Sequence, residues 1–180
     1  MTEQEIRKGQ DKTLRKLLAA VSGGVGETLG SLVDKPLKIQ PGVLDYIEPD
    51  DLLLELDGSR VVARGALDKA YAGHFLLVAF TVPDAITLSG MLMMTPDEVI
   101  GERRNAPQWQ EDDVEVFGEV GNILFSGVDE VLRSKVKGDI GLRLQDHHLI
   151  TAGQDEQGVL GELPLIRWVG NMTVGDYPSG

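Results

Sequence analysis

Two long segments of the chain place apolar residues at helical spacing. The first begins at Lys12 and ends near Leu37, because Pro36 cannot continue a helix; its apolar positions are Leu14, Leu17, Leu18, Val21, Val25, Leu29 and Leu32. The second runs from about Asp112 to Lys137, with Phe117, Val120, Leu124, Val128 and Val131 on one face. A narrow polar stripe occupies its opposite face: Glu115, Glu119, Asn122, Ser126, Asp129 and Arg133. The spacing predicts two amphipathic helices.

Extended segments are expected between and after these helices. Two apolar runs within residues 50–67 flank Asp57-Gly58, a dipeptide typical of hairpin turns, and predict a hairpin. The uninterrupted apolar run 74–82 predicts a strand that is buried on both faces. Residues 83–94 predict a helix with a proline in its first turn, and the polar connector that follows has room for one short helix. In the rest of the sequence, the apolar segments at residues 140–150 and 158–170 predict two or more short strands.

An internal repeat relates the two long helices. Residues 24–33, GVGETLGSLV, match residues 127–136, GVDEVLRSKV, at an offset of 127 − 24 = 103 residues. An apolar strand is predicted directly after the helix in both places. We therefore expect one α/β or α+β domain spanning residues 1–180, with a central β-sheet and two equivalent long helices on one of its faces. Residues 1–11 are expected to form a flexible N-terminal segment.

The composition narrows the functional class. A chain of 180 residues with 42% hydrophobic residues is sufficient for one domain with a full core. Cysteine is absent, no apolar run approaches the length of a membrane span, and the polar N-terminus does not resemble a secretion signal, so a cytoplasmic location without membrane partners is expected. The net charge of −12 argues against nucleic-acid binding, which depends on clustered Lys and Arg.

The second helix contains three interior glycines, Gly118, Gly121 and Gly127, although each costs a helix about 1 kcal/mol relative to alanine. Two explanations are open: the glycines permit close approach of another protein to the polar stripe, or they permit close packing inside this protein. The polar stripe is equally ambiguous, because any amphipathic surface helix has a polar face. Composition and spacing alone therefore do not identify a site.

The segment DDVEVFGEVGNILFSGVDEVL, however, resembles the signature helix of the CheC/CheX/FliY family of chemotaxis phosphatases. That signature consists of Asp or Ser, three residues, Glu, two residues and Asn, and it matches Glu119 and Asn122 in the context E-x-G-N-I-L. GGVGETLGSLVDKPLKI resembles the family's first helix and following strand, and GMLMMTPDEV resembles its segment before the second helix. The resemblance covers most of the chain and implies the CheC-like fold.

This sequence departs from the family pattern at two positions. Glu115 stands where the family has Asp or Ser, and Gln145 stands where a proline often follows the signature. At the equivalent positions of the first helix, Lys16 and Ala19 replace a second Glu and Asn, so one active pair per chain is possible. A single pair resembles the CheX branch, whose members are dimers, and implies a homodimer.

The resemblance also implies a chemistry. The family's substrate is the aspartyl phosphate of a CheY-like response regulator, whose hydrolysis needs positioning more than acid–base catalysis. Asn122 would hold the attacking water, Glu119 would pair with the regulator's active-site lysine, and the regulator would supply Mg²⁺. The surrounding residues expected to contact the partner are Glu115, Gly118, Ser126 and Asp129. A non-catalytic adaptor that binds a signalling or flagellar partner is the alternative, and a purely structural dimer module is a third possibility.

A metal site on this chain is not expected. Asp146, His147 and His148 are consecutive, but neighbouring side chains of a strand point to opposite faces, so the two imidazoles would not converge on one ion.

Overall fold

The computed structural model describes residues 3–178, and the side chains of residues 3–10, 41 and 178 lie outside this description. A long helix, a strand and a short helix come first: α1 (Glu3–Val33), β1 (Leu37–Ile47) and α2 (Pro49–Glu55). The middle of the chain forms β2 (Arg60–Leu67), the single turn η1 (Lys69–Tyr71), β3 (Phe75–Thr81), α3 (Val82–Leu92) and α4 (Asp97–Asn105). The last part forms α5 (Glu111–Lys135), β4 (Leu142–Ile150), β5 (Leu165–Val174) and β6 (Tyr177–Pro178).

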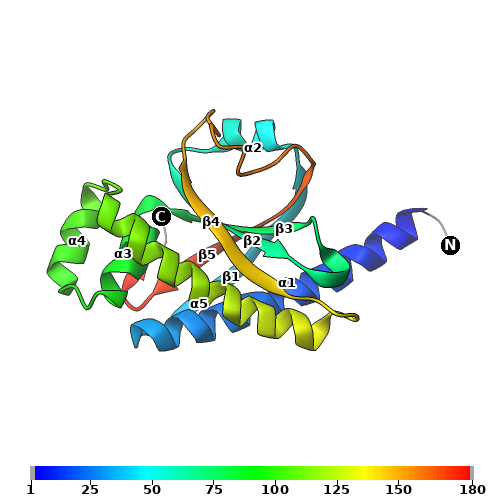
Figure 1. Ribbon diagram of the computed structural model, residues 1–180, viewed down its shortest axis with the longest axis horizontal. Helices are drawn as coiled ribbons and strands as arrows, with labels where there is room; N and C mark the ends of the chain where they lie inside the picture. Colours follow the sequence, from blue (N-terminus) through cyan, green and yellow to red (C-terminus); the bar gives the residue numbers. More distant parts are fainter. Residues whose placement is uncertain (1–2, 179–180) are drawn as a thin grey trace.

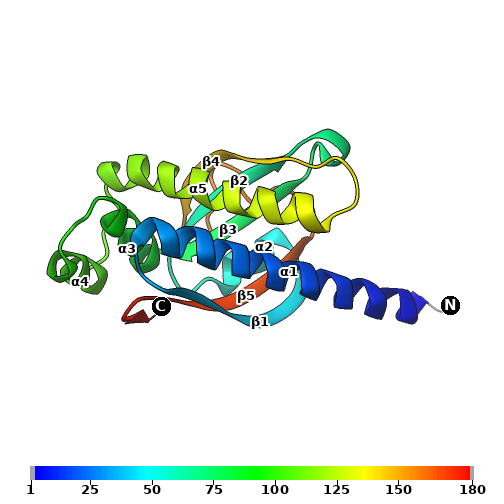
Figure 2. The ribbon, with the colours of Figure 1, turned by 90° about the horizontal axis from the view of Figure 1, so that it is seen from below.

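The described strands form two three-stranded antiparallel sheets, with strand orders β1-β5-β6 and β3-β2-β4. Helices α1 and α5 lie side by side and antiparallel in one layer on the same side of both sheets (Figure 2). The N-terminal end of α1 projects beyond the rest of the molecule (Figure 1). The predicted α+β class and the two long helices on one face are therefore confirmed, although the β-structure is divided between two sheets.

Most apolar side chains are buried between the α1–α5 layer and the sheets. Fully buried members of this core come from both long helices, from β2 and from α3: Leu29, Val61, Ala63, Ala85, Ile86, Leu88, Phe117, Val120, Leu124 and Val128. A second, smaller core lies on the other face of β2, where α2 packs against Val62, Ile150, Val159 and Leu160. Strand β2 lies between β3 and β4, and each of its two faces contacts one of the cores.

The repeat seen in the sequence is also present in the structure. A long helix leads into a strand in both halves, as α1 to β1 and as α5 to β4. The helices cross at two equivalent glycines: Gly24 lies against Val131, and Gly127 lies against Thr28. Val131 and Thr28 are themselves equivalent at the 103-residue offset, so the contacts are reciprocal. The two halves are thus related by an approximate two-fold axis that passes between α1 and α5.

The predicted hairpin around Asp57-Gly58 is wrong in its first half. Residues 49–55 form the helix α2, and only the second half forms a strand, β2. Pro49 stands at the start of α2 and two aspartates occupy its first turn, which are both favourable at a helix N-terminus. The leucines of this segment then reach the smaller core from a single helical face: Leu52, Leu53 and Leu56.

The prediction that residues 74–82 form a strand buried on both faces is also wrong. Strand β3 is at the edge of its sheet, and Phe75 is 47% exposed. The guanidinium carbon of Arg64 lies 3.7 Å from the centroid of the Phe75 ring, so a cation covers an aromatic face that the core does not. The strand with both faces buried is β2.

The remaining helix predictions agree with the structure except at their ends. Helix α3 begins at Val82 with Pro83 in its first turn, and the short helix after Pro96 is α4. Helix α1 already begins at Glu3, so residues 3–11, expected to be a flexible segment, are helical. No helix in the described part of the chain combines the length and the apolar composition needed to cross a bilayer.

Candidate functional site

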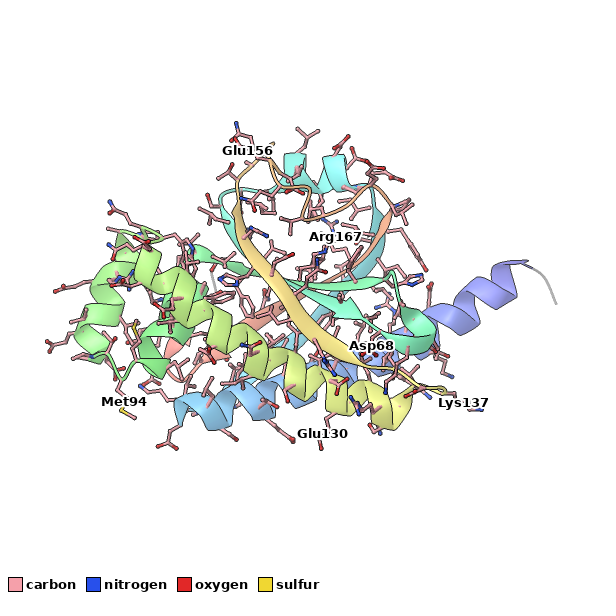
Figure 3. All side chains as sticks on the ribbon, viewed as in Figure 1. Asp68, Met94, Glu130, Lys137, Glu156 and Arg167 are labelled. Atoms are coloured by element: carbon pink, nitrogen blue, oxygen red, sulfur yellow. The ribbon has the colours of Figure 1, made fainter. Side chains whose placement is uncertain are left out.

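The polar stripe of α5 faces solvent over most of its length. Glu115, Glu119, Asn122 and Ser126 are all exposed. Glu119 and Asn122 are one helical turn apart, a spacing at which side chains are neighbours on a helix surface. Neither forms a hydrogen bond or an ion pair with the side chains that the structure describes. Further along α5, Glu130 also points outward from the molecule (Figure 3).

The opposite face of α5 is held tightly by the core. Phe117 is fully buried and makes edge-to-face contacts with Phe80 of β3 and with Trp109, at centroid distances of 5.7 and 5.6 Å. Val120, Leu124 and Val128 continue this buried face. A helix with one face so completely buried cannot rotate, so the direction of the stripe is fixed by packing.

The interior glycines of α5 are explained by packing within this protein. A Cβ atom added at Gly121 would lie 3.1 Å from the side chain of Leu144 in β4, and one added at Gly118 would lie 3.3 Å from the ring of His147. Gly127 lies against Thr28 of α1 in the same way. The three glycines therefore allow α5 to approach β4 and α1 closely. The role of Gly118 in contacting a partner stays a prediction, and its missing side chain would point toward His147.

His147 forms a contact that the sequence did not reveal. Its Nε2–H donates a hydrogen bond to the carbonyl oxygen of Val114, at 2.8 Å. Its ring also lies 5.8 Å from the ring of Phe117. His147 thus connects β4 to the first turns of α5, directly beneath the exposed stripe. His148 points to the other face of β4, where its Nε2 is 3.5 Å from Asp146.

The first turn of α5 is fixed by a buried ion pair. The guanidinium of Arg103 in α4 donates to both carboxylate oxygens of Asp113, at 2.9 and 2.6 Å, and Asp113 is only 1% exposed. The same carboxylate accepts a hydrogen bond from the backbone N–H of Gln110, at 2.9 Å. Hydrogen bonding to Asp113 raises the pKa of Arg103 above its ordinary value. Because Asp113 is bonded both to Arg103 and to an otherwise unpaired backbone N–H at the helix start, it holds the end of α5 that carries Glu115.

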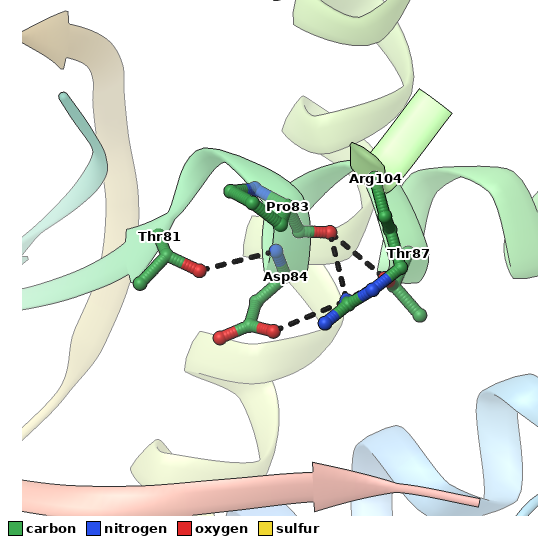
Figure 4. Close-up of polar contacts among 5 residues, drawn as sticks. All are labelled: Thr81, Pro83, Asp84, Thr87 and Arg104. Carbon is green, nitrogen blue, oxygen red and sulfur yellow. Dashed lines mark hydrogen bonds and ion pairs between the residues drawn. The ribbon is translucent and has the colours of Figure 1, made fainter. Parts of the chain in front are cut away.

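A second polar cluster holds α4 in place (Figure 4). Arg104 donates to the carbonyl of Pro83 and to the carboxylate of Asp84, at 3.1 and 3.2 Å, and also contacts the hydroxyl of Thr87. Thr81 accepts a hydrogen bond from the backbone of Asp84 and caps α3. Adjacent arginines of α4 therefore serve different neighbours: Arg104 fixes α4 on α3, and Arg103 fixes the start of α5.

Asp129 differs from Glu115, Glu119, Asn122 and Ser126 because it is only partly exposed and is bonded within this protein. One carboxylate oxygen accepts a hydrogen bond from the backbone N–H of Leu142, at 2.8 Å, and the other pairs with Arg133, at 2.7 Å. Asp129 thereby fixes the first residue of β4. Contact between Asp129 and a partner stays a prediction. Because Asp129 is engaged within this protein, the freely available part of the stripe spans three turns, from Glu115 to Ser126.

The two residues that depart from the family pattern lie on the exposed face of α5 and at an irregularity of β4. Glu115 is exposed one turn before Glu119. Gln145 lies in β4 at an irregularity of the sheet, where Arg64 pairs with Asp146 and the next residue of β2 pairs with Leu144. A bulge of this kind tolerates proline because the extra residue is left out of the ladder. In this chain Gln145 occupies that position of the bulge.

In the equivalent half of the molecule, Lys16 and Ala19 are exposed on α1 and do not reproduce a Glu–Asn pair. Among the residues that the structure describes, no group of three or more His, Cys, Asp or Glu side chains is arranged to hold a metal ion. The chemistry available at the Glu119–Asn122 pair is thus that of one carboxylate, which accepts hydrogen bonds, and one amide, which donates and accepts them.

A scan against protein-family models and a search of curated proteins found no match. Solved structures do match. FliY from Thermotoga maritima superimposes with a TM-score of 0.71 at 12% identity, covering 89% of this chain and 80% of FliY. The middle domain of FliM from H. pylori gives 0.71 at 10% identity over 99% of this chain and 90% of that one. FliM in a FliG–FliM complex from H. pylori gives a TM-score of 0.71 at 11% identity, covering 100% of this chain and 91% of that one. The chain therefore has the fold shared by FliY and the FliM middle domain, the fold that its resemblance to the CheC/CheX/FliY family implies.

Proposed function

We propose that this protein binds a phosphorylated CheY-like response regulator through the exposed stripe of α5 and accelerates hydrolysis of its aspartyl phosphate. The observation that carries the proposal is the exposure of Glu119 and Asn122 one turn apart on a helix whose opposite face is completely buried. A convex, rigid helix with two free polar groups is suited to entering the active-site cleft of another protein.

The proposed roles follow from the chemistry of the two side chains. An aspartyl phosphate is already activated, so a group that aligns a water molecule with the phosphorus lowers the barrier through positioning. Asn122 cannot act as a base, but its amide can hold such a water through hydrogen bonds. Glu119 pairs with the regulator's active-site lysine and sets the register of the complex. The regulator supplies the Mg²⁺ ion, and this chain contributes no metal ligand.

The experiment is to phosphorylate a CheY-like regulator with a small phosphodonor, remove the donor and follow the loss of phosphate with and without this protein. The proposal predicts faster loss that scales with the amount of protein added. A regulator that loses phosphate at its intrinsic rate at every protein concentration would contradict the proposal.

A second candidate function is a non-catalytic adaptor of the flagellar switch or of a signalling complex. Two observations favour it: the likeness to FliM structures solved with FliG and with SpeE, and the departures at Glu115 and Gln145. The same experiment separates the two functions when binding is measured in parallel. Binding of the regulator without faster phosphate loss selects the adaptor.

A further inference from the structure

The two equivalent halves of the molecule differ in what occupies the space between helix and strand. In the second half, the carboxylate of Asp129 in α5 accepts a hydrogen bond from the backbone N–H of Leu142, at 2.8 Å. Arg133, one turn further along α5, pairs with the same carboxylate. At the 103-residue offset, the corresponding residues of the first half are Gly26, Gly30 and Ile39. Glycines therefore replace both charged side chains in the first half.

An open hollow of about 760 Å³ lies where these two side chains have no counterpart, and we name it the α1–β1 hollow. It lies between α1 and the first residues of β1, which runs beside α1 on the side away from α5 (Figure 2). Both elements line it: Ala19, Gly23, Gly26 and Gly30 from α1, and Lys38 and Ile39 from β1. A Cβ atom added at Gly23 would meet nothing within 4 Å, so this part of the lining is open to an incoming group.

Strand β1 presents a free edge to the hollow. Among the strands that the structure describes, β1 pairs only with β5. The N–H of Gly175 donates to the carbonyl of Pro36, at 2.9 Å, and in an antiparallel ladder every second residue from Pro36 exchanges hydrogen bonds with β5. Leu37 and Ile39 therefore direct their backbone groups away from β5. The carbonyl oxygen and amide nitrogen of Leu37 confirm this, because they lie 3.2 and 3.4 Å from Cβ atoms added at two glycines of α1.

The second half of the molecule indicates which chemistry suits this edge. There the N–H of Leu142 is bonded to a carboxylate, whereas the equivalent N–H of Ile39 forms no hydrogen bond with the side chains that the structure describes. The neighbouring Lys38 is exposed and likewise has no ion pair within the described part of the chain. The acidic residues that line the hollow, Glu27 and Asp34, belong to α1 and not to the strand. A backbone donor beside a free ammonium group is suited to a carboxylate.

The free edge also determines the shape of the occupant. An extended segment can pair with a strand edge through its backbone, whereas the backbone groups inside a helix are already bonded to one another. The usable edge is short, because Pro41 has no N–H and the register with β5 is irregular between Pro41 and Leu44. Pairing is therefore centred on Ile39, beside the open lining at Gly23.

We propose that the α1–β1 hollow binds a short extended segment of a partner protein that carries an aspartate or a glutamate. The carboxylate of the segment accepts a hydrogen bond from the N–H of Ile39, in the way that Asp129 accepts one from Leu142. The backbone of the segment pairs with the edge of β1. This surface is on the other long helix from Glu119 and Asn122, so it can be occupied whether or not the chain acts as a phosphatase.

Hydrogen exchange of the free protein tests the geometry first. The amide of Leu142 is bonded to Asp129 and should exchange slowly. The amide of Ile39 faces the hollow and should exchange at least about tenfold faster. An Ile39 amide that is protected as strongly as that of Leu142 would overturn the proposal, because its N–H would not be available to a partner.

A phage-displayed library of random dodecapeptides then supplies the probe. The library is depleted on Gly23→Arg, whose long side chain fills the hollow without a clash at its Cβ atom, and is then selected on the wild-type chain. The selected peptides are expected to carry an aspartate or glutamate among β-branched residues. Replacing that carboxylate with the corresponding amide should weaken binding of the synthetic peptide at least about tenfold. Binding should also slow exchange of the Ile39 amide.

Gly101→Arg is the matched control, because a Cβ atom at Gly101 of α4 also meets nothing within 4 Å and the residue does not line the hollow. It should bind the peptide like wild type, and circular dichroism confirms that both variants fold. The proposal is overturned if no peptide survives the depletion, if the amide peptide binds equally well, or if Gly101→Arg weakens binding as much as Gly23→Arg.

Sedimentation velocity separates a partner protein from a second copy of this chain. If wild type associates with itself and Gly23→Arg does not, another copy occupies the hollow, and the proposal of a partner segment is wrong. None of these measurements follows phosphate loss from a regulator, so failure of this proposal and failure of the proposed function are distinguished.

Discussion

Gly127 of α5 is packed directly against Thr28 of α1, where a Cβ atom would lie 3.0 Å from the Cβ of Thr28 and still closer to its hydroxyl. Gly127→Ala is therefore expected to destabilise the protein, because the two helices must move apart. Overpacking of this kind costs about 1–3 kcal/mol, and the gain in helix propensity offsets about 1 kcal/mol of it. Urea unfolding followed by circular dichroism should show a lower midpoint. Gly127→Ala/Thr28→Ala should recover part of the loss, because the second substitution removes the hydroxyl and the methyl group of Thr28 and leaves only its Cβ atom in close contact.

Gly23 provides the opposite case on α1. A Cβ atom added there would meet nothing within 4 Å, and the residue is exposed. Gly23→Ala is expected to stabilise the protein by about 0.5–1 kcal/mol through helix propensity and a less flexible unfolded chain. Urea unfolding followed by circular dichroism measures this gain in stability as a higher midpoint. A loss of stability in Gly23→Ala, or a gain in Gly127→Ala, would contradict the packing explanation of the helix glycines.

The reciprocal contact at Gly127 indicates why the sequence predicted so much of this fold. The repeated motif at residues 24–33 and 127–136 is the region in which the two helices cross, so it is constrained by packing and is visible as a pattern. Residues 50–56 carry no such constraint. Their leucines suit a strand or one turn of helix equally, and only contact with the smaller core, assembled from distant strands, selects the helix.

Asn122 is expected to be the residue on which the phosphatase activity depends most. Asn122→Ala should abolish acceleration of phosphate loss, because alanine cannot orient a water molecule. Each tenfold loss of rate corresponds to about 1.4 kcal/mol of barrier height. The fold should be unaffected, since an exposed helix position favours alanine. Phosphate loss from the regulator and urea unfolding of the variant are measured together.

Asn105→Ala is the control for this measurement, because Asn105 is exposed on α4 and lies outside the stripe. It should retain full activity. If Asn122→Ala is as active as Asn105→Ala, Asn122 does not position the water, and the adaptor function is favoured.

The sequence predicted the position of the stripe but not the contacts that support it. Glu119 and Asn122 were located by helical spacing and a short signature, which are local properties. Asp113 is one of three acidic residues in the first turn of α5, and nothing in the sequence distinguishes it from Glu111 and Asp112. Its partner Arg103 comes from a different helix. The bond between His147 and Val114 likewise depends on how β4 packs under α5. Such tertiary contacts have no periodic pattern in a single sequence.

The buried pair of Arg103 and Asp113 should be essential for the order of the first turns of α5. Asp113→Asn retains the shape of the side chain but removes its charge, leaving Arg103 without its counter-ion. Breaking a buried pair in this way costs about 3–5 kcal/mol, and the lower end applies because Arg103 is 25% exposed. Hydrogen exchange should show faster exchange of the amides near residues 111–117. Asp112→Asn, at an exposed neighbouring position, should change neither stability nor exchange appreciably.

Arg167 of β5 joins β1 and α2, since it donates to both oxygens of Asp45, at 2.9 and 2.6 Å, and also pairs with Glu55. These hydrogen bonds lower the pKa of Asp45 below its ordinary value of 3.8. A group whose pKa is lower in the folded state contributes stability above its unfolded pKa and loses that contribution as the pH falls through the folded pKa. The stability difference between wild type and Asp45→Asn should therefore be constant from about pH 8 to pH 5 and should shrink below about pH 4. Carbon-13 NMR titration of the Asp45 carboxyl group tests the cause: its midpoint should rise toward 3.8 in Arg167→Gln. An unchanged midpoint in that variant would show that Arg167 does not cause the shift.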